Sequence, residues 1–344
     1  MPAAYQRPYH AAITAFGAYV PQRILNNKEL SETVETSDEW IVQRTGIRER
    51  RIADTSEFTS DLCYRAVEDM IRRFGVSLTD VDMIVVATIT PDHPMPSVAA
   101  QLQARLGIER AGAIDLAAAC AGFVYGLQVA TAFVASGMAR KVLVVGGETL
   151  SKVTDYEDRS TCILFGDGAG VCLLEPAAEP GVLAFGNHTV GHAAHLLYRS
   201  GLRPDVQGTP VAGNGCIVQS GREVFKLAVQ TLEAEVPRLL TDAGLSTAEL
   251  DWFVPHSANL RLIESVCERM GWPMEKTLFS GEWYGNTSSA SIPLAIQIAI
   301  DDGRLQPGHT LLLAGFGSGF VYAGAVIRWS AVPSSIHTPH ESEA

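Results

Sequence analysis

The 344-residue chain lacks several features that would assign it to a specialised class of protein. Its six cysteines include no C-x-x-C pair, which argues against a zinc ribbon and against a dense disulfide framework. Residues 1–10 hold no apolar segment typical of a signal peptide. The longest apolar runs, such as 142–146 and 311–315, have the length of a strand and are far shorter than a membrane span. We therefore expect a cytoplasmic protein that does not enter a membrane.

Positive charge is also scarce. The chain has 26 Lys and Arg against 38 Asp and Glu, which gives a formal charge of −12. Such a balance argues against a protein that binds nucleic acid or an anionic membrane over its whole surface. Local clusters remain, because Arg44, Arg48, Arg50 and Arg51 closely follow Trp40. These charges form either a solvated face or a patch for a phosphate-bearing ligand or an acidic carrier protein.

The glycine-rich segments lack the residues that nucleotide-binding loops require. Residues 315–320 (GFGSGF) do not fit G-x-G-x-x-G, have no P-loop lysine, and place the serine one position away from a G-x-S-x-G elbow. Their amides are instead suited to holding an oxyanion. Residues 165–170 (FGDGAG) are interpreted as a tight turn between strands. His188, His192 and His195 have a spacing that could bind zinc, but glycines and alanines interrupt the segment, so we predict solvated surface and no metal site.

What the chain does contain is a large apolar fraction, 47% of its residues, in the alternating pattern of an α/β protein with a buried sheet. Short aliphatic runs predict strands at 13–20, 83–88, 141–146, 170–174, 252–255, 310–314 and 320–328. Longer amphipathic stretches predict helices at 61–74, 98–106, 120–135, 224–243, 260–270 and 288–301. Only the tails, 1–10 and 332–344, look disordered.

A weak internal repeat divides the chain into an N-terminal half, 11–178, and a C-terminal half, 179–331. Asp82 and Cys120 are 38 positions apart (120 − 82), and Asp251 and Asn286 are 35 apart (286 − 251). Two copies of one βαβαβ unit would place Cys120 and Asn286 at equivalent helix N-termini, facing each other across a pseudo-two-fold axis. The repeat therefore predicts which residues converge.

Three segments carry candidate catalytic residues. Cys120 lies among small residues before a predicted helix, where the helix N-terminus would favour a nucleophilic thiolate; a buried structural cysteine is the alternative. His256 ends a strand, where ligand-facing groups of α/β sheets gather, although a structural histidine fits as well. Asn286 follows a glycine, and taken alone it reads as a turn or a helix cap.

Together these motifs resemble the family of 3-oxoacyl-acyl-carrier-protein synthase III, over about residues 11–330. The resemblance rests on residues 36–48 (TSDEWIVQRTGIR), 117–122 (AAACAG), 165–170, 255–261 (PHSANLR), 284–289 (YGNTSS) and 315–320. It implies the thiolase fold, a duplicated α/β fold in a five-layer αβαβα sandwich, and a homodimer. It also implies an acyltransferase that condenses a short-chain acyl-CoA with malonyl-acyl-carrier protein (malonyl-ACP) and so initiates type II fatty-acid synthesis, without a metal or other cofactor.

The resemblance also implies roles for individual residues. Cys120 would be the acylated nucleophile, and His256 and Asn286 its partners. The amides of Cys120 and Ser318 would form the oxyanion hole. Coenzyme A would contact Trp40, Arg44, Arg159, Phe225, Ala228 and Asn259; the carrier protein would contact Lys226 and Arg261; and Met95 and Phe316 would border the acyl pocket.

Two departures from the family pattern concern the acyl pocket and the glycine loop. Met95 stands where relatives often carry Phe, at the dimer interface, so a flexible side chain could admit longer or branched primers. Ser318 stands where Gly is common, although its backbone donor is kept. Residues 147–156 and 252–257 look closest to the second synthase III copies of Bacillus-like bacteria, which favour branched short acyl-CoAs. The alternatives are an acyltransferase or condensing enzyme of secondary metabolism on the same fold, and a non-catalytic acyl-CoA-binding protein.

Overall fold

The computed structural model of the protein describes residues 9–211 and 213–333. Two large β-sheets form its framework. The tails expected at 1–10 and 332–344 lie mostly outside the described residues. Within the N-terminal one, His10 already begins the first strand.

The first sheet belongs to the N-terminal half. Its five strands follow the spatial order β1 (His10–Tyr19), β7 (Asp167–Ala177), β6 (Val142–Thr149), β4 (Met83–Ala87) and β5 (Gly112–Leu116). Strands β6, β4 and β5 are parallel, whereas β7 runs antiparallel to β6 and β1. Every residue of β6 is buried, which explains its uninterrupted apolar run.

The second sheet belongs to the C-terminal half and repeats this arrangement. Its four strands follow the order β13 (Trp252–Pro255), β14 (Thr310–Gly317), β15 (Val321–Arg328) and β8 (Val182–Thr189). Strands β13 and β14 are parallel, and β15 is antiparallel to both of its neighbours. An isolated parallel bridge between Phe253 and Thr277 stands where the first sheet has β5.

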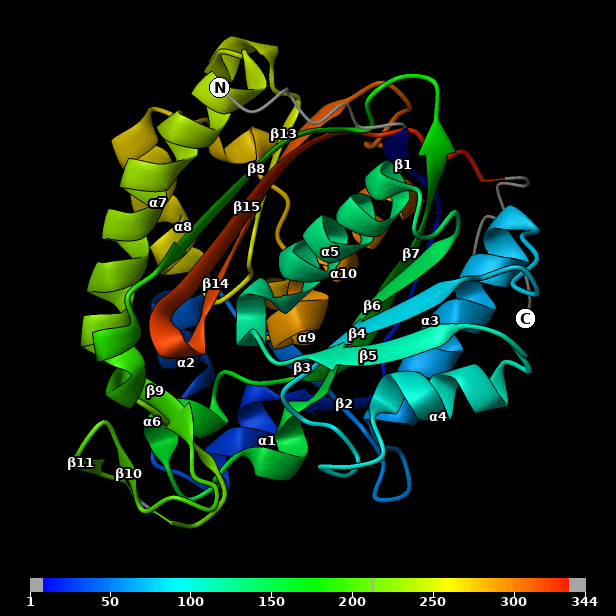
Figure 1. The fold of residues 1–344 in the computed structure, drawn as a ribbon. Helices are drawn as coiled ribbons and strands as arrows, with labels where there is room; N and C mark the ends of the chain where they lie inside the picture. Colours follow the sequence, from blue (N-terminus) through cyan, green and yellow to red (C-terminus); the bar gives the residue numbers. More distant parts are fainter. Residues whose placement is uncertain (1–8, 212, 334–344) are drawn as a thin grey trace, which may run out of the picture.

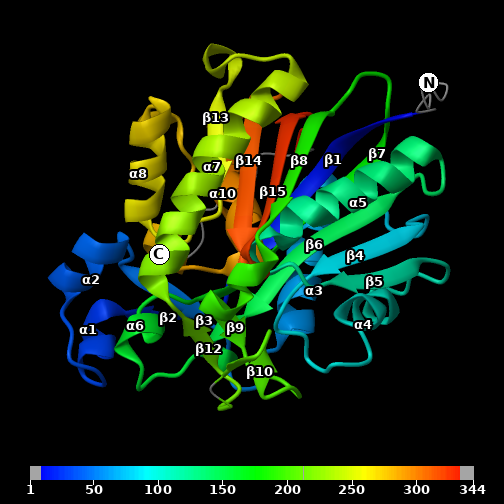
Figure 2. The ribbon, with the colours of Figure 1, turned by 60° about the vertical axis from the view of Figure 1, so that its left-hand side comes forward.

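The helices complete five layers, as expected. They are α3 (Thr59–Phe74), α4 (Val98–Arg105), α5 (Gly122–Ser136), α7 (Gly221–Ala243), α8 (Leu260–Met270) and α10 (Ser291–Asp301). Helices α5 and α10 lie between the two sheets, α3 and α4 cover the outer face of the first sheet, and α7 and α8 cover that of the second (Figures 1 and 2). The central helices are mostly buried, which explains their strongly apolar composition.

One helical stretch, Ala119–Ser136, is apolar and long enough to cross a membrane by length and composition. It consists of α5 and the turn before it, and 67% of it is buried inside the protein. A helix packed between two sheets needs the same apolar composition as a membrane span.

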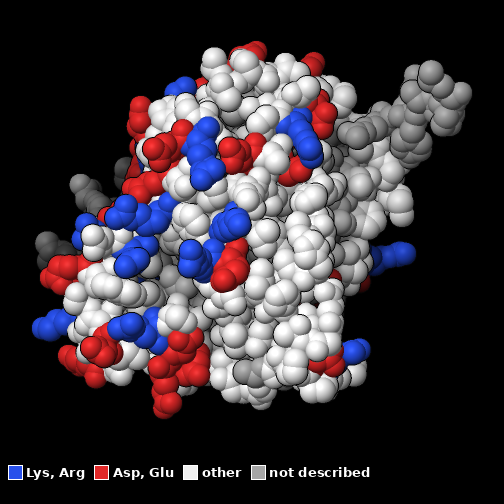
Figure 3. Space-filling view, turned by 90° about the vertical axis from the view of Figure 1, so that its left-hand side faces the viewer, with Lys and Arg blue, Asp and Glu red and all other residues white. Residues whose placement is uncertain are grey.

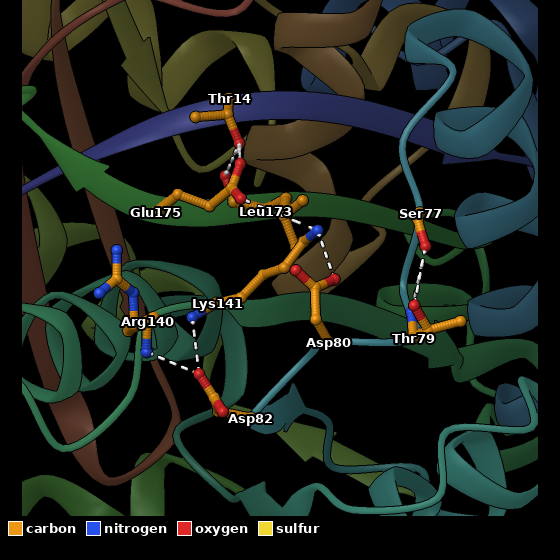
Figure 4. Close-up of polar contacts among 9 residues, drawn as sticks. All are labelled: Thr14, Ser77, Thr79, Asp80, Asp82, Arg140, Lys141, Leu173 and Glu175. Carbon is orange, nitrogen blue, oxygen red and sulfur yellow. Dashed lines mark hydrogen bonds and ion pairs between the residues drawn. The ribbon is translucent and has the colours of Figure 1, made fainter.

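The repeat has a constant offset at the ends of the parallel strands. Asp82 and Asp251, which precede β4 and β13, are 169 residues apart (251 − 82). The first residues of the neighbouring parallel pairs, Val142 opposite Met83 and Leu311 opposite Trp252, are separated by the same number (311 − 142). The Asp82 carboxylate accepts hydrogen bonds from the amides of Arg140 (2.7 Å) and Lys141 (3.1 Å) at the start of β6, as Figure 4 shows. The Asp251 carboxylate accepts one from the Thr310 amide, at 2.8 Å, at the start of β14.

This offset corrects the predicted alignment of Cys120 with Asn286. The turns before the central helices, η1 (Ala119–Ala121) and η6 (Ser288–Ala290), are also 169 residues apart (288 − 119), and both begin with a left-handed residue, at φ 45° for Ala119 and φ 48° for Ser288. Cys120 is therefore equivalent to Ser289. Asn286 lies three residues before Ser289 and is equivalent to Ala117 (286 − 117 = 169).

The glycines at 166–170 are also not the predicted tight turn. Asp167 begins β7, and the strand is buried along this part. A side chain at Gly168 would meet Leu294 at 2.9 Å, and one at Gly170 would meet Pro293 at 2.4 Å. These glycines therefore allow β7 to pack directly against α10.

Long connections gather at one end of the sheets, towards the bottom of Figures 1 and 2. Between β1 and α3 the chain forms β2 (Arg23–Asn26), α1 (Asn27–Ser31), α2 (Asp38–Thr45) and β3 (Glu49–Ile52). Between β8 and α7 it forms η3 (Gly191–Leu196), β9 (Leu197–Arg199), β10 (Asp205–Val206), β11 (Thr209–Pro210) and β12 (Ile217–Gln219). Between β6 and β7 it forms η2 (Leu150–Val153) and α6 (Arg159–Cys162).

The remaining short elements lie in the C-terminal half and are η4 (Thr247–Glu249), η5 (Met274–Lys276), α9 (Gly281–Tyr284) and η7 (Ser318–Phe320). The sequence pattern predicted none of these short elements, including those within the long connections, because each element is too short to show a periodicity.

Candidate active site

A cavity of about 360 Å³ opens where the two halves meet, and it is mostly apolar. The structure brings Cys120, His256 and Asn286 together in its wall. The long connections supply much of the remaining lining, including Ile163, Leu197 and Ile217. Polar groups from both halves thus converge in a largely apolar chamber, which is the usual form of a small-molecule site.

Cys120 lies in the turn η1 at the N-terminus of α5. The turn is closed by a hydrogen bond from the Ala121 amide to the Ala118 carbonyl at 3.1 Å, whereas the Cys120 amide donates to no backbone carbonyl of the described residues. Burial raises the pKa of the Cys120 thiol to about 12, and hydrogen bonding from the Ser288 hydroxyl opposes this rise. The side chain is only partly covered, but it faces an enclosed chamber, so water solvates the sulfur poorly. The resting thiol is therefore protonated.

The end of β14 packs directly on the backbone of Cys120. A side chain at Gly315 would meet the Ala121 Cα at 2.7 Å and the Cys120 carbonyl oxygen at 3.0 Å. One at Gly317 would meet the Cys120 amide nitrogen at 2.7 Å. Gly315 and Gly317 thus allow β14 to approach Cys120 closely and leave the Cys120 amide uncovered. The sequence predicted that these glycines expose their own amides, and the structure shows that they also leave that of Cys120 accessible.

His256 follows β13 and is almost fully buried. Its amide donates to the Ala314 carbonyl at 2.8 Å, and its ring packs edge-on against Phe316. Its Nδ1 lies 2.7 Å from the Ser291 hydroxyl, which also accepts from the Ser257 amide at 3.4 Å. The Ser291 proton is then free to donate to Nδ1, an arrangement that favours the tautomer with its proton on Nε2. Burial lowers the pKa of His256 to about 3, so the ring is neutral.

Asn286 is held through its backbone. Its amide donates to the Leu164 carbonyl at 2.8 Å, and its carbonyl accepts from the Gly166 amide at 3.1 Å. The side-chain Oδ1 accepts from the Ser288 amide at 2.9 Å, which leaves the side-chain NH2 without a protein acceptor among the described residues. Asn286 is therefore oriented as a donor.

Three polar residues at the site were missed from the sequence. The Ser288 hydroxyl is buried without a well-formed hydrogen bond, and Ser291 holds His256. Glu148, at the end of β6, is buried and accepts from the hydroxyls of Thr90 (2.6 Å) and Ser289 (3.1 Å). Burial raises the pKa of this carboxyl to about 7. The repetition of serine at the start of the apolar helix α10 was the one signal that could have identified the serines.

A second, open cavity of about 560 Å³ adjoins the first and carries three arginines, Arg44, Arg222 and Arg261. Basic side chains gather at the middle of the face that carries α2, α7 and α8 (Figure 3). The guanidinium carbons of Arg44 and Arg159 lie 5.7 and 5.3 Å from the centre of the Trp40 ring. Trp40 and Arg159 do not themselves line the cavity, and Trp40 adjoins it through Arg44. Despite the acidic total, this region is thus suited to an anionic ligand with a planar group.

The other predicted binding residues are distributed unevenly. Phe225 and Asn259 line both cavities, and Phe316 lines the first, as does Ser318. The remaining ones line neither cavity and are Ala228, which is completely buried, Lys226, which is exposed, and Met95, which is 84% exposed. Ala228 therefore packs in the core and lines neither of these cavities.

The histidine cluster lies apart from these cavities, with His188 in β8 and His192 and His195 in η3. The His195 Nδ1 lies 3.2 Å from the His192 carbonyl. Within residues 9–211 and 213–333, no group of three or more His, Cys, Asp or Glu is arranged to hold a metal ion.

Comparison with known proteins agrees with this architecture. Residues 114–191 match the family model for 3-oxoacyl-[acyl-carrier-protein (ACP)] synthase III, and residues 240–329 match the model for its C-terminal part. Proteins called beta-ketoacyl-[acyl-carrier-protein] synthase III 2 from Halalkalibacterium halodurans and Bacillus subtilis are each 54% identical to the chain, over 93% of its length and 97% and 98% of theirs. The crystal structure of beta-ketoacyl-[acyl carrier protein] synthase III from Thermus thermophilus superposes with a TM-score of 0.90 at 43% identity, covering 93% of this chain and all of that one. The chain therefore belongs to the 3-oxoacyl-[acyl-carrier-protein] synthase III family of acyl-transferring condensing enzymes.

Proposed function

We propose that the protein condenses a short-chain acyl-CoA with malonyl-ACP, releases CO2 and forms 3-oxoacyl-ACP, the first condensation of type II fatty-acid synthesis. The observation that carries this proposal is the convergence of Cys120, His256 and Asn286 in one apolar chamber. Membership of the synthase III family supports it.

In the first step the Cys120 sulfur attacks the thioester of acyl-CoA. The thiol proton leaves with the CoA sulfur, so that acyl-Cys120 and free CoA are formed. The N-terminus of α5 and the Ser288 hydroxyl stabilise the developing thiolate, which offsets the raised pKa of the thiol. The amide of Cys120, left uncovered by Gly317, and that of Ser318 hold the oxyanion of the tetrahedral intermediate.

In the second step malonyl-ACP loses CO2, and its thioester becomes an enolate. Neutral His256, with its proton on Nε2, and the free NH2 of Asn286 each donate a hydrogen bond to the enolate oxygen. The enolate carbon attacks the acyl carbonyl and the C–S bond to Cys120 breaks. The thiolate then takes a proton to regenerate the thiol. Both steps exchange thioesters or form a carbon–carbon bond, so neither calls for a metal or redox cofactor.

Coenzyme A and the carrier protein bind at the open cavity. The Trp40 ring, flanked by Arg44 and Arg159, stacks on the adenine, and Phe225 and Asn259 line the path of the pantetheine arm. Lys226 and Arg261, both exposed, contact the acidic carrier protein. These partners place the reaction in the cytoplasm.

The functional unit is a homodimer. Strand β5 forms the edge of the first sheet, and its apolar residues are only half-buried. Met95 is 84% exposed and lies in the sequence just before α4, the helix that leads into β5. A second copy packed along this edge would cover it. From there its flexible side chain borders the acyl pocket of the partner and admits branched primers. The likeness to synthase III 2 proteins of Bacillus and its relatives supports this primer choice.

A panel of acyl-CoAs tests the proposal. Acetyl-, isobutyryl-, isovaleryl- and octanoyl-CoA are each incubated with the enzyme, acyl-Cys120 is read by intact mass, and CO2 release is measured after malonyl-ACP is added. We expect acylation and condensation with the short primers, fastest with the branched ones. Acylation without malonyl-ACP turnover would favour transfer to an oxygen or nitrogen nucleophile, and no acylation at all would refute the proposal.

A further inference from the structure

Arg50, on β3, is the largest completely buried side chain of the described residues. Its guanidinium forms no ion pair with any carboxylate there. Its Nε and one terminal nitrogen donate to the Ile163 carbonyl, the former at 3.1 Å, and the other terminal nitrogen donates to Asn27 Oδ1 at 2.5 Å. Burial lowers the pKa of this guanidinium to about 10, still well above neutral pH. The protein therefore keeps in its interior a cation with no direct ion pair, whose nearest carboxylate, Asp38, acts on it through Asn27. An apolar side chain of the same size would avoid the cost of desolvating the charge.

The stem of Arg50 touches the residue before Asn286. A side chain at Gly285 would meet the Arg50 Cγ at 2.9 Å, and Gly285 itself has φ 69°, a left-handed conformation. The segment that starts at Ile163 lies on the other side of Asn286. Leu164 accepts from the Asn286 amide, and Gly166 donates to the Asn286 carbonyl. Arg50 thus fixes Asn286 from two directions, through Gly285 and through Ile163.

The same guanidinium connects this loop with the arginines around Trp40. Ile163 is the C-cap of α6, the short helix that begins with Arg159. On the other side Asn27 donates to Asp38 at 2.7 Å, in the first turn of the helix that carries Trp40. Arg50 therefore lies between the segments that carry the proposed coenzyme A contacts and the loop of Asn286.

We infer that Arg50 is a positioning residue for the condensation step: its buried guanidinium holds Ile163, and through residues 164–166 the Asn286 loop, in the geometry in which the Asn286 amide donates to the enolate. The inference rests on the proposed function, since it assigns Asn286 to the second step. A displacement of about 1 Å in such a donor is enough to slow a reaction by about a hundredfold. The acylation of Cys120 does not use Asn286 and is expected to continue.

The test separates the two steps in Arg50→Met and Arg50→Lys. The rate of acyl-Cys120 formation is read by intact mass with isobutyryl-CoA, and CO2 release from malonyl-ACP is measured with preformed acyl-enzyme. We expect Arg50→Met to slow condensation by about thirtyfold or more and Arg50→Lys by about tenfold, with acylation changed by less than about threefold. In an Asn286→Ala background Arg50→Met should add less than about threefold, because both substitutions remove one interaction.

A matched control is Lys141→Met, which removes another buried cation, at the far end of the first sheet beside Asp80 and Glu175 (Figure 4). Lys141→Met should lower the melting temperature and leave the ratio of the two rates unchanged. Equal losses of both steps in the Arg50 variants, effects that multiply with Asn286→Ala, or the same change of ratio in Lys141→Met would overturn the inference. If Arg50→Met fails to fold, Arg50→Lys alone decides. If wild-type protein does not condense, or Asn286→Ala does not slow condensation, the proposed function itself is wrong.

Discussion

The two halves of the molecule use one backbone design for opposite purposes. Position 120 in the first half and position 289 in the second each follow a left-handed residue and precede a central helix. Cys120 is partly exposed to the chamber, whereas Ser289 is buried and donates to Glu148 and to the Ala87 carbonyl. The repeat thus provides two equivalent helix starts: one carries the proposed nucleophile and the other is buried in the core.

The strands that face these helix starts differ in the same way. Gly317, at the end of β14, is equivalent to Glu148, at the end of β6 (317 − 148 = 169). The missing side chain of Gly317 leaves the Cys120 amide uncovered, while Glu148 fills the corresponding space beside Ser289. The uncovered amide of Cys120 is available to stabilise an oxyanion, whereas the Glu148 side chain occupies the equivalent space in the other half.

A third pair of equivalent positions differs at the ends of β4 and β13. Ala87 and Gly122 of the first half are equivalent to His256 and Ser291 of the second (256 − 87 and 291 − 122, both 169). The first pair is in apolar contact, and the second pair forms a hydrogen bond of 2.7 Å. In the proposed mechanism the nucleophile therefore comes from the first half, and the side chains that donate hydrogen bonds to the enolate come from the second.

Replacing the equivalent residues Cys120 and Ser289 by alanine gives the largest expected difference between the two halves. Cys120→Ala should reduce acyl-enzyme formation at least about a thousandfold, because the nucleophile is lost. Ser289→Ala should keep acylation within about threefold but lower the free energy of unfolding by about 1–3 kcal/mol, because buried Glu148 loses a donor. Intact-mass kinetics and urea unfolding measure the two effects. Acylation of Ser289 in the Cys120→Ala variant would show that the halves are not specialised.

The buried carboxyl of Glu148 predicts a pH dependence of the free energy of unfolding. The pKa of Glu148 is about 7 in the folded protein against 4.5 for a free carboxyl, so its contribution is fully present below pH 4.5 and is lost as the pH rises through 7. Unfolding measured at pH 5 and pH 8 should show wild type losing about 3 kcal/mol relative to Glu148→Gln, which cannot ionise. Equal pH dependence of the two proteins would mean that Glu148 is not held protonated.

The glycines at which the halves touch should separate the two reaction steps. A methyl group at Gly315 would press on residues 120 and 121, and one at Gly146, its equivalent, would meet the Ser289 carbonyl oxygen at 2.5 Å. Gly315→Ala should therefore slow acylation by about tenfold, and Gly146→Ala should slow condensation more than acylation, because its strain falls near Asn286. Gly191→Ala, where a methyl group meets nothing within 4 Å, is the control. If both variants lose the same step, the halves do not divide the chemistry.

The smallest expected effect concerns the helices that follow β4 and β13. The amides that open α4 donate to Asp115, at 2.7 Å from Val98 and 2.9 Å from Ala99. The start of α8 instead carries Arg261 at the mouth of the open cavity. Arg261→Glu should raise the KM for malonyl-ACP by about five- to tenfold with little change in kcat, and less so at high salt. The control is Arg269→Glu at the far end of α8, where Arg269 pairs with Glu233. An unchanged KM for Arg261→Glu would refute this docking site.

The sequence predicted the main helices and seven strands of the two sheets, because these stretches have clear periodicities. It missed β5 and β8, whose residues are mostly half-buried or exposed. It predicted the central helix starts less well. Asn286 was aligned with Cys120 because a glycine and an asparagine precede the helix, but α10 begins at Ser291, 169 residues after α5 begins at Gly122, so the equivalent of Cys120 is Ser289 (291 − 122 and 289 − 120). The glycines at 166–170 were assigned to a turn, because a close approach of β7 to α10 leaves no local signal.

By itself the sequence determined the α/β class, the duplication, and the three residues Cys120, His256 and Asn286 that converge in one chamber. Their roles were predicted from the resemblance to the synthase III family, because each of them taken alone also fitted a structural interpretation. Only the tertiary structure decided which groups surround them: Ser288 lies beside Cys120, Ser291 holds His256, and Arg50 holds Ile163, 113 positions away in the chain. Spacing along a chain carries no record of such contacts, because they exist only once the two halves have packed together.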